Sequence, residues 1–303
     1  MLWLSLACWP AYAAAEAHMM ATDSFSTLDS IIAEQGHAQT TLLVMDDDDT
    51  LTMMPCTDAS DITHCQYLGG PAWSSWQQSL LGTASPYRVA ASENELFAIS
   101  SVLFALNFMD YAEPQLPQVL QSLTAQGVRL LVETARGNGD ISATENQLAN
   151  LTLDSSPSSM SLQTLIATHG LAMPTMQSSL PSPFMPCATQ GVRPVSYRQG
   201  VMYVAGQNKG DMLSCLLSHT EPQSNITHIL FIDDTEQNVQ DVYTRFKDSA
   251  QYVVTAIHYT RLQQHKAALT SGPLSAVYQQ QANLRWLTLK NIIATTLLKP
   301  TIQ

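Results

Sequence analysis

Basic residues are scarce in this chain of 303 residues: 13 lysines and arginines stand against 25 aspartates and glutamates, so the formal net charge is -12. The first lysine or arginine is Arg88. Among the residues before it, the only ionisable side chains of acidic or basic type are aspartates, glutamates and histidines. Such an acidic surface repels nucleic-acid phosphates and anionic lipid headgroups, and no basic patch offsets it. The composition therefore argues against a nucleic-acid-binding protein and against a peripheral membrane protein.

Two further motifs are missing. The sequence has no CxxC pair and no cysteine and histidine cluster at zinc spacing, which argues against a structural zinc site. The apolar stretch Leu96–Met109 is too short for a transmembrane helix, which needs about 20 residues. The length fits one large domain, or a core with a sizeable insertion, with enough residues to bury a core.

The N-terminus resembles a secretory signal peptide. A short apolar run, Leu2–Tyr12, is followed by Ala13, and small residues occupy the two positions that a signal peptidase reads. The basic residues that usually precede such a run are absent. We expect residues 1–13 to be the signal peptide and the protein to be periplasmic or secreted.

Export permits disulfide bonds, and four cysteines remain if Cys8 leaves with the signal peptide. Cys56 and Cys65 are close enough in sequence to close one loop. The spacing of Cys187 and Cys215 does not establish whether they meet.

Strands and helices alternate along the chain. Short apolar runs of the kind buried on both faces of a sheet are followed by segments with helical spacing of apolar residues. The predicted strands are Thr41–Met45, Val128–Val132, Val201–Ala205, His228–Ile232 and Tyr252–Ile257. The predicted helices are 24–35, 73–81, 93–109, 117–126, 144–151, 209–217, 236–246 and 274–298. This alternation predicts an α/β fold whose parallel sheet has helices on both faces.

Four aspartates, Asp46 to Asp49, follow the first predicted strand directly. A solvated acidic run and a helix N-cap are alternatives, but acidic runs rarely adjoin a buried strand and a cap explains one aspartate. An EF-hand calcium loop is excluded, because Leu51 and Thr57 stand where its glycine and glutamate would be.

A second acidic pair, Asp233 and Asp234, follows another predicted strand. Helix capping is the alternative for this pair. The carboxyl ends of parallel strands meet at one edge of a sheet, so the two groups are expected to lie together. Bringing Asp46, Asp48 and Asp233 together without a cation is costly, since like charges a few ångströms apart repel strongly. Oxygen ligands of this kind indicate Mg²⁺.

Four short motifs occur in order at predicted strand ends or a helix start. They are Asp46–Thr50, Thr134 at the end of an apolar strand, Lys209 at the start of a helix, and Asp233-Asp234 with Asn238 beyond. This set resembles the haloacid dehalogenase superfamily of phosphohydrolases over about residues 40 to 260. The crowded first motif and the segment Gln66–Trp73 are similar to an exported bacterial subgroup of unknown function.

The resemblance implies a Rossmannoid parallel sheet formed by residues 22–51 and 117–303. It also implies a mainly helical cap formed by residues 52–116, inserted after the first motif and covering the active site. The implied activity is a Mg²⁺-dependent phosphatase of the acid-phosphatase kind, acting on a small phosphomonoester. The alternatives are a phosphotransferase or phosphomutase, and a catalytically silent binding or host-interaction protein.

The resemblance also implies roles for particular side chains. Asp46 would be the nucleophile that forms an aspartyl-phosphate, and Asp48 the general acid and base. Thr134 and Lys209 would bind the phosphoryl group, and Lys209 would keep Asp46 ionised. Mg²⁺ would be held by the Asp46 carboxylate, the Asp48 backbone carbonyl, Asp233 and Asp234.

Some residues remain open to more than one interpretation. Arg136 could contact the phosphate or substrate, or form an ion pair with nearby acids. Asp47 and Asp49 are expected to point away from the pocket or to cap the turn.

Trp73 and Trp76, three apart on a predicted helix, fit a core stripe better than a pocket wall. We interpret His64 and His258 as structural.

Overall fold

The structure is a computed structural model that describes residues 16–58, 61–156, 158–174, 176–187, 192–220 and 225–297. The expected signal peptide, residues 1–13, lies outside the described residues. Among the described residues, no helix has the length and apolar character needed to cross a bilayer.

A seven-stranded sheet forms the centre of the larger part of the molecule, in the order β1-β9-β8-β2-β5-β7-β6. All neighbours pair in parallel except β6, which is antiparallel to β7. The strands are β1 His18–Thr22, β2 Thr41–Met45, β5 Arg129–Thr134, β6 Ser196–Arg198, β7 Val201–Tyr203, β8 His228–Asp233 and β9 Val253–Tyr259. The predicted α/β fold with a mostly parallel sheet is confirmed.

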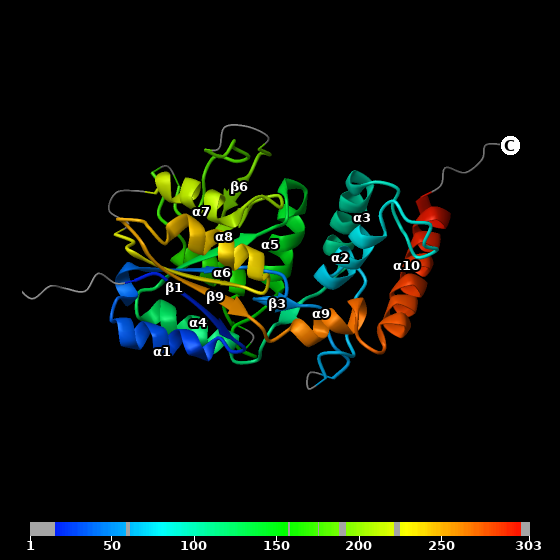
Figure 1. Ribbon diagram of the computed structural model, residues 1–303, viewed down its shortest axis with the longest axis horizontal. Helices are drawn as coiled ribbons and strands as arrows, with labels where there is room; N and C mark the ends of the chain where they lie inside the picture. The colour runs from blue at the N-terminus through cyan, green and yellow to red at the C-terminus, as the bar shows by residue number, and fades with distance from the viewer. Residues whose placement is uncertain are drawn as a thin grey trace, which may run out of the picture.

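Helices cover both faces of this sheet (Figure 1). Successive strand residues point to opposite faces, so Leu43 and Leu230 belong to one apolar cluster and Leu42 and Phe231 to the other. The helices whose residues share the first cluster are α1 Ser26–Gln35, α4 Leu116–Ala125, α5 Ile141–Asn150 and α6 Leu162–His169. Those that share the second are α7 Lys209–Ser218 and α8 Glu236–Phe246.

A separate helical unit stands beside the sheet and has its own apolar core (Figure 1). It consists of α2 Pro71–Leu80, α3 Glu93–Leu106, α9 Gln263–Thr270 and α10 Ser275–Leu297. Trp73 is completely buried in it and Trp76 is 7% exposed, which confirms that these tryptophans are core residues. The resemblance implies that the C-terminal tail belongs with the sheet. Tyr278 and Ala282 of α10 instead share the cluster of Trp73, so the tail packs with the inserted helices.

Short elements connect the two units. The small antiparallel pair β3 Thr52–Met53 and β4 Asp110–Tyr111 joins the start and the end of the inserted segment. The remaining elements are single turns of 3-10 helix, η1 Ala38–Thr40 and η2 Asn138–Asp140. Since β3 begins three residues after Asp49, the insertion begins at the candidate site.

Two disulfides are present among the described residues. Cys56 and Cys65 are joined, which confirms the pairing suggested by their spacing. Cys187 and Cys215 are also joined, which sequence spacing had left open. The first closes the loop that leads into the helical unit, and the second ties the segment before β6 to α7.

Candidate active site

The three central strands β8, β2 and β5 end at one edge of the sheet and bring the acidic motifs together. Met45 pairs in register with Ile232 on one side and with Val132 on the other. The backbone N–H of Asp46 donates to the carbonyl of Ile232 over 3.0 Å. Asp46 and Asp233 therefore follow a pair of residues that lie side by side in β2 and β8.

A tight turn after β2 separates the four aspartates into two pairs. The Asp47 carbonyl accepts the N–H groups of Leu51 and Thr52, each at 2.9 Å, and Asp49 has a left-handed φ of 60°. This geometry places Asp46 and Asp48 in the wall of a cavity and Asp47 and Asp49 in the interior.

The interior pair has contrasting partners. The Asp47 carboxylate accepts a 2.9 Å hydrogen bond from the Thr52 hydroxyl, whereas neither carboxylate oxygen of Asp49 has a partner among the described residues. Burial raises the pKa of Asp47 and raises that of Asp49 well above its usual range. The expectation that both side chains point away from the cavity is confirmed.

Lys209, the first residue of α7, bridges two of the acids. Its Nζ donates to Asp46 Oδ1 over 2.5 Å and to Asp233 Oδ2 over 2.6 Å, and its side chain is 1% exposed. Burial lowers its pKa, but Asp233 and Asp46 outweigh burial and the net direction is upward. Burial raises the pKa of Asp46, and Lys209 opposes that rise. The predicted lysine is thus in direct contact with the predicted nucleophile.

Arg136 clamps the turn from the β5 side. It donates to both carboxylate oxygens of Asp48, over 2.8 and 2.7 Å, and lies 3.4 Å from Asp47. Its Nη1 also donates to the side chains of Thr144 and Gln147 on α5. Of the two interpretations of Arg136, the structure therefore places it in an ion pair with the acids.

Thr134, the last residue of β5, is buried beside this clamp. Its hydroxyl accepts the backbone N–H of Arg136 over 3.2 Å. The turn that follows, Ala135 to Gly137, forms part of the cavity wall. The threonine thus stands at the strand end predicted for it.

The neighbouring Glu133 is a buried carboxyl that the sequence analysis did not single out. It is completely buried, and neither of its carboxylate oxygens has a partner among the described residues. Burial raises its pKa to about 8, with Lys209 opposing the rise.

The two residues of the second acidic pair, Asp233 and Asp234, make different contacts. Asp233 Oδ1 accepts the backbone N–H of Thr235, and both of its oxygens accept from Asn238 at 3.1 Å in addition to the Lys209 contact. Asp234 instead faces the cavity. Its backbone N–H donates to Thr50 Oγ1 over 3.0 Å, and the same hydroxyl lies 3.5 Å from Asp46 Oδ2.

Lys266 is a site residue that the sequence analysis missed. It belongs to α9 of the helical unit, and its Nζ donates to Asp234 Oδ2 over 2.5 Å. It contributes to the cavity wall, and its side chain is 34% exposed. Lys266 thus joins the helical unit to the acidic edge of the sheet.

The cavity has a volume of about 720 Å³ and lies between the sheet edge and the helical unit. Asp46, Asp48, Asp234 and Arg136 form its floor, while Thr134, Lys209 and Asp233 lie behind that wall. Side chains from α2 and α3 line the opposite wall, among them Ser74, Gln78, Glu93, Phe97 and Ser100. The volume accommodates a small organic molecule.

Three clusters of metal-ligating side chains occur among the described residues. In the two that contain cysteine, Cys56 with Cys65 and Cys187 with Cys215, the sulfurs are joined in disulfides and offer no thiolate. The third comprises Asp46, Asp233 and Asp234, whose carboxylates lie within 4.8 Å of one another. Burial, together with the neighbouring carboxylates, raises the pKa of Asp46 and of Asp234. A divalent cation would offset this cost of keeping both groups ionised. These all-oxygen donors fit Mg²⁺.

The two histidines treated as structural have partners. His64 lies on the surface, 2.5 Å from Asp61, and His258 Nε2 lies 3.1 Å from the Asp234 carbonyl. His258 therefore supports the backbone of the acidic pair without facing the cavity.

Comparison with known proteins gives one finding about the family of the chain. A search among curated proteins finds no match. A family model described as "Protein of unknown function (DUF2608)" matches residues 21–298, which include both the sheet and the helical unit. The chain belongs to this DUF2608 family.

Proposed function

We propose that this protein is a magnesium-dependent phosphohydrolase of the haloacid dehalogenase kind that acts on a small phosphomonoester. The observation that carries the proposal is the contact of Lys209 with both Asp46 and Asp233 at the ends of adjacent strands. Lys209 is separated from the acids it joins by 163 and 24 residues, so the contact depends on the pairing of β2 with β8 and on the position of α7.

Asp46 is the nucleophile in this proposal. A carboxylate oxygen of Asp46 attacks phosphorus, the bond from phosphorus to the ester oxygen breaks, and the leaving oxygen takes a proton from Asp48. Water then attacks the aspartyl-phosphate, Asp48 accepts its proton, and cleavage of the phosphorus–oxygen bond to Asp46 releases phosphate.

The surrounding residues orient and neutralise these groups. Lys209 holds the Asp46 carboxylate in position, Asp233 also accepts from Lys209, and Asn238 in turn donates to Asp233. Arg136 donates to both oxygens of the Asp48 carboxylate, and the protonated Asp48 that starts the cycle, restored by the proton of the hydrolytic water, keeps one of these two hydrogen bonds. Thr134 stands beside the turn that would face the phosphoryl oxygens.

Mg²⁺ would be held by Asp46, Asp234 and the Asp48 backbone carbonyl, with Asp233 adjacent. When bound, it supplies positive charge that lets an anionic phosphate approach these acids and stabilises the transferred group. Of the acidic pair, Asp234 is the better ligand, because Asp233 already accepts from Lys209, Thr235 and Asn238. The helical unit, as the cap of the site, would exclude water and select the substrate.

Two observations support export of the protein. Both disulfides, Cys56–Cys65 and Cys187–Cys215, require an oxidising compartment to persist. Together with the signal-like residues 1–13, they favour a periplasmic or secreted enzyme.

Release of inorganic phosphate from an aryl phosphate tests the proposal. We expect hydrolysis with Mg²⁺, loss of activity with a chelator, and a fall in kcat of roughly 10³-fold or more in Asp46→Asn. Asp211→Asn is the matched control, since Asp211 lies on the same helix as Lys209 and its side chain is 57% exposed. Undiminished turnover by Asp46→Asn would contradict the mechanism.

The alternative functions separate in the same assay. A competing alcohol that diverts the phosphoryl group into a new ester indicates a phosphotransferase. Phosphate binding without any turnover over a panel of metabolite phosphates indicates the silent binding protein.

A further inference from the structure

The cations of the site differ in how many of their hydrogen-bond donors are free. Arg136 has five N–H donors, and four hydrogen bonds to Asp48, Thr144 and Gln147 use most of them. Lys209 is almost completely buried behind the wall, where Asp46 and Asp233 hold it. Each of these two cations keeps a single donor without an acceptor among the described residues.

Lys266 is arranged differently. An ammonium group has three donors, and one of them binds Asp234 Oδ2 over 2.5 Å. The other two have no protein acceptor among the described residues, and the side chain belongs to the cavity wall. Lys266 thus combines a fixed charge partner with donors that a ligand can use.

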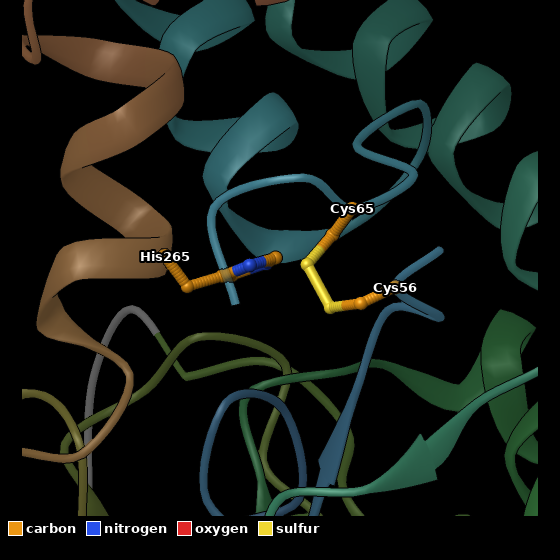
Figure 2. A group of neighbouring side chains, drawn as sticks. All are labelled: Cys56, Cys65 and His265. Atoms are coloured by element: carbon orange, nitrogen blue, oxygen red, sulfur yellow. A yellow bond between two sulfur atoms is a disulfide. The ribbon is translucent and has the colours of Figure 1, made fainter. Parts of the chain in front are cut away.

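The start of α9 is fixed to the loop that follows β3. His265, which precedes Lys266, is completely buried, and its Nδ1 lies 2.8 Å from the Ile62 carbonyl. Tyr67 donates to the His265 carbonyl over 3.1 Å and stacks on its ring at 4.8 Å. Figure 2 shows the His265 side chain extending from its helix toward the Cys56–Cys65 disulfide. The backbone of Lys266 is therefore held in place while its long side chain reaches the cavity.

The negative charge of the cavity floor indicates what the open donors of Lys266 could bind. Asp46, Asp48 and Asp234 face the cavity and would repel a dianionic phosphate. Arg136 compensates Asp48 and Lys209 compensates Asp46, and Lys209 lies behind the cavity wall. Beside a bound Mg²⁺, a cation that lines the cavity and has two open donors would hold the phosphoryl oxygens.

We propose that Lys266, which belongs to α9 of the helical unit, binds the phosphoryl group of the substrate and the phosphate product while it keeps its hydrogen bond to Asp234. This assignment rests on the proposed function and deepens it. It makes the C-terminal helices part of the phosphate site, which the sequence motifs assign to the sheet edge alone.

Binding of inorganic phosphate to the whole protein in the presence of Mg²⁺, measured by calorimetry, tests the assignment without requiring turnover. We expect Lys266→Met to raise the Kd for phosphate by roughly tenfold or more, because a charge-assisted hydrogen bond is lost. Lys266→Arg should restore most of the affinity. Lys290→Met is the matched control, since Lys290 is an exposed lysine of the same helical unit.

A second measurement separates phosphate binding from a purely structural role. Mg²⁺ binding in the absence of phosphate should be no weaker in Lys266→Met than in the wild type, because removing the ammonium frees Asp234. Should Lys266→Met fail to fold, Lys266→Gln, which keeps a donor for Asp234 but removes the charge, replaces it and should show the same loss of phosphate affinity.

Three results would overturn the assignment: unchanged phosphate affinity in Lys266→Met, an equal loss of Mg²⁺ and phosphate affinity, or a wild-type protein that binds no phosphate with Mg²⁺. By contrast, Lys266-dependent phosphate binding without hydrolysis of any ester would contradict the proposed hydrolase and leave this assignment standing.

Discussion

The two walls of the cavity are built in opposite ways. On the sheet side, Asp46, Lys209 and Arg136 are buried and joined by short contacts from several elements. On the helical side, Phe97 is 49% exposed, and two of the Lys266 donors have no acceptor in the described part of the chain. Buried side chains that several contacts hold in position suit the reacting atoms. Exposed side chains with donors to spare suit the recognition of a ligand. We infer that the sheet carries the chemistry and the helical unit carries the selection.

The strongest test of this contrast is removal of the clamp on the sheet side. Arg136→Met leaves Asp47 and Asp48 without their cation in a buried place, so we expect a loss of about 3–5 kcal/mol in the free energy of unfolding. Denaturant unfolding measures it. Arg193→Met is the control, because Arg193 lines the same cavity but is exposed, and should cost about 0.5 kcal/mol or less. Equal effects of the two variants would mean that the sheet wall is no more rigid than the rest.

The two disulfides offer the next comparison, since one closes the loop that leads into the helical unit and the other ties the segment before β6 to α7. Cys187 and Cys215 are 28 residues apart and Cys56 and Cys65 are 9 apart. From loop length, paired Cys→Ser changes should cost about 3–4 kcal/mol for the first and about 2–3 kcal/mol for the second. Thermal and denaturant unfolding give these values.

The two paired Cys→Ser variants should rank in the opposite order when their phosphate affinity is measured. The Cys56–Cys65 loop is the one that anchors His265 beside Lys266, so its loss should weaken phosphate binding more than loss of Cys187–Cys215. If both pairs affect phosphate affinity equally, the anchoring of α9 by the first loop is wrong.

The smallest expected effect concerns Glu133 and depends on pH. Its folded-state pKa is raised to about 8 from an ordinary value of 4.5, so its favourable contribution is complete below pH 4.5 and is lost as pH rises toward 8. Glu133→Gln removes this loss. We expect the variant to be more stable than the wild type by about 1–3 kcal/mol at pH 8 and similar to it near pH 4.5. A stability difference that does not change with pH would contradict a buried, unpartnered Glu133.

The sequence predicts those parts of the molecule whose signal is local. β2, β5 and β8 are continuous apolar runs, and the acids after β2 and β8 meet because parallel strands end together. The edge strands β1 and β6 were not predicted, since β1 is mostly exposed and β6 has three residues.

The long-range pairings could not be predicted from local patterns. Arg136 fits a phosphate contact and an ion pair equally well in sequence, and the choice depends on Thr144 and Gln147 of another helix. Lys266 lies on α9, whose polar sequence gives no clear periodic signal, and only the packing of the C-terminal helices against the insertion brings it to Asp234.

The most direct test of the central claim is detection of a phosphoryl group on Asp46. Wild-type protein mixed with an aryl phosphate and Mg²⁺ is quenched in acid, and its peptides are analysed by tandem mass spectrometry. Our account predicts a phosphoryl group on Asp46 of the wild type and none at this position in Asp46→Asn. Phosphate release with the covalent group on another residue, or equally fast release by Asp46→Asn, would contradict it.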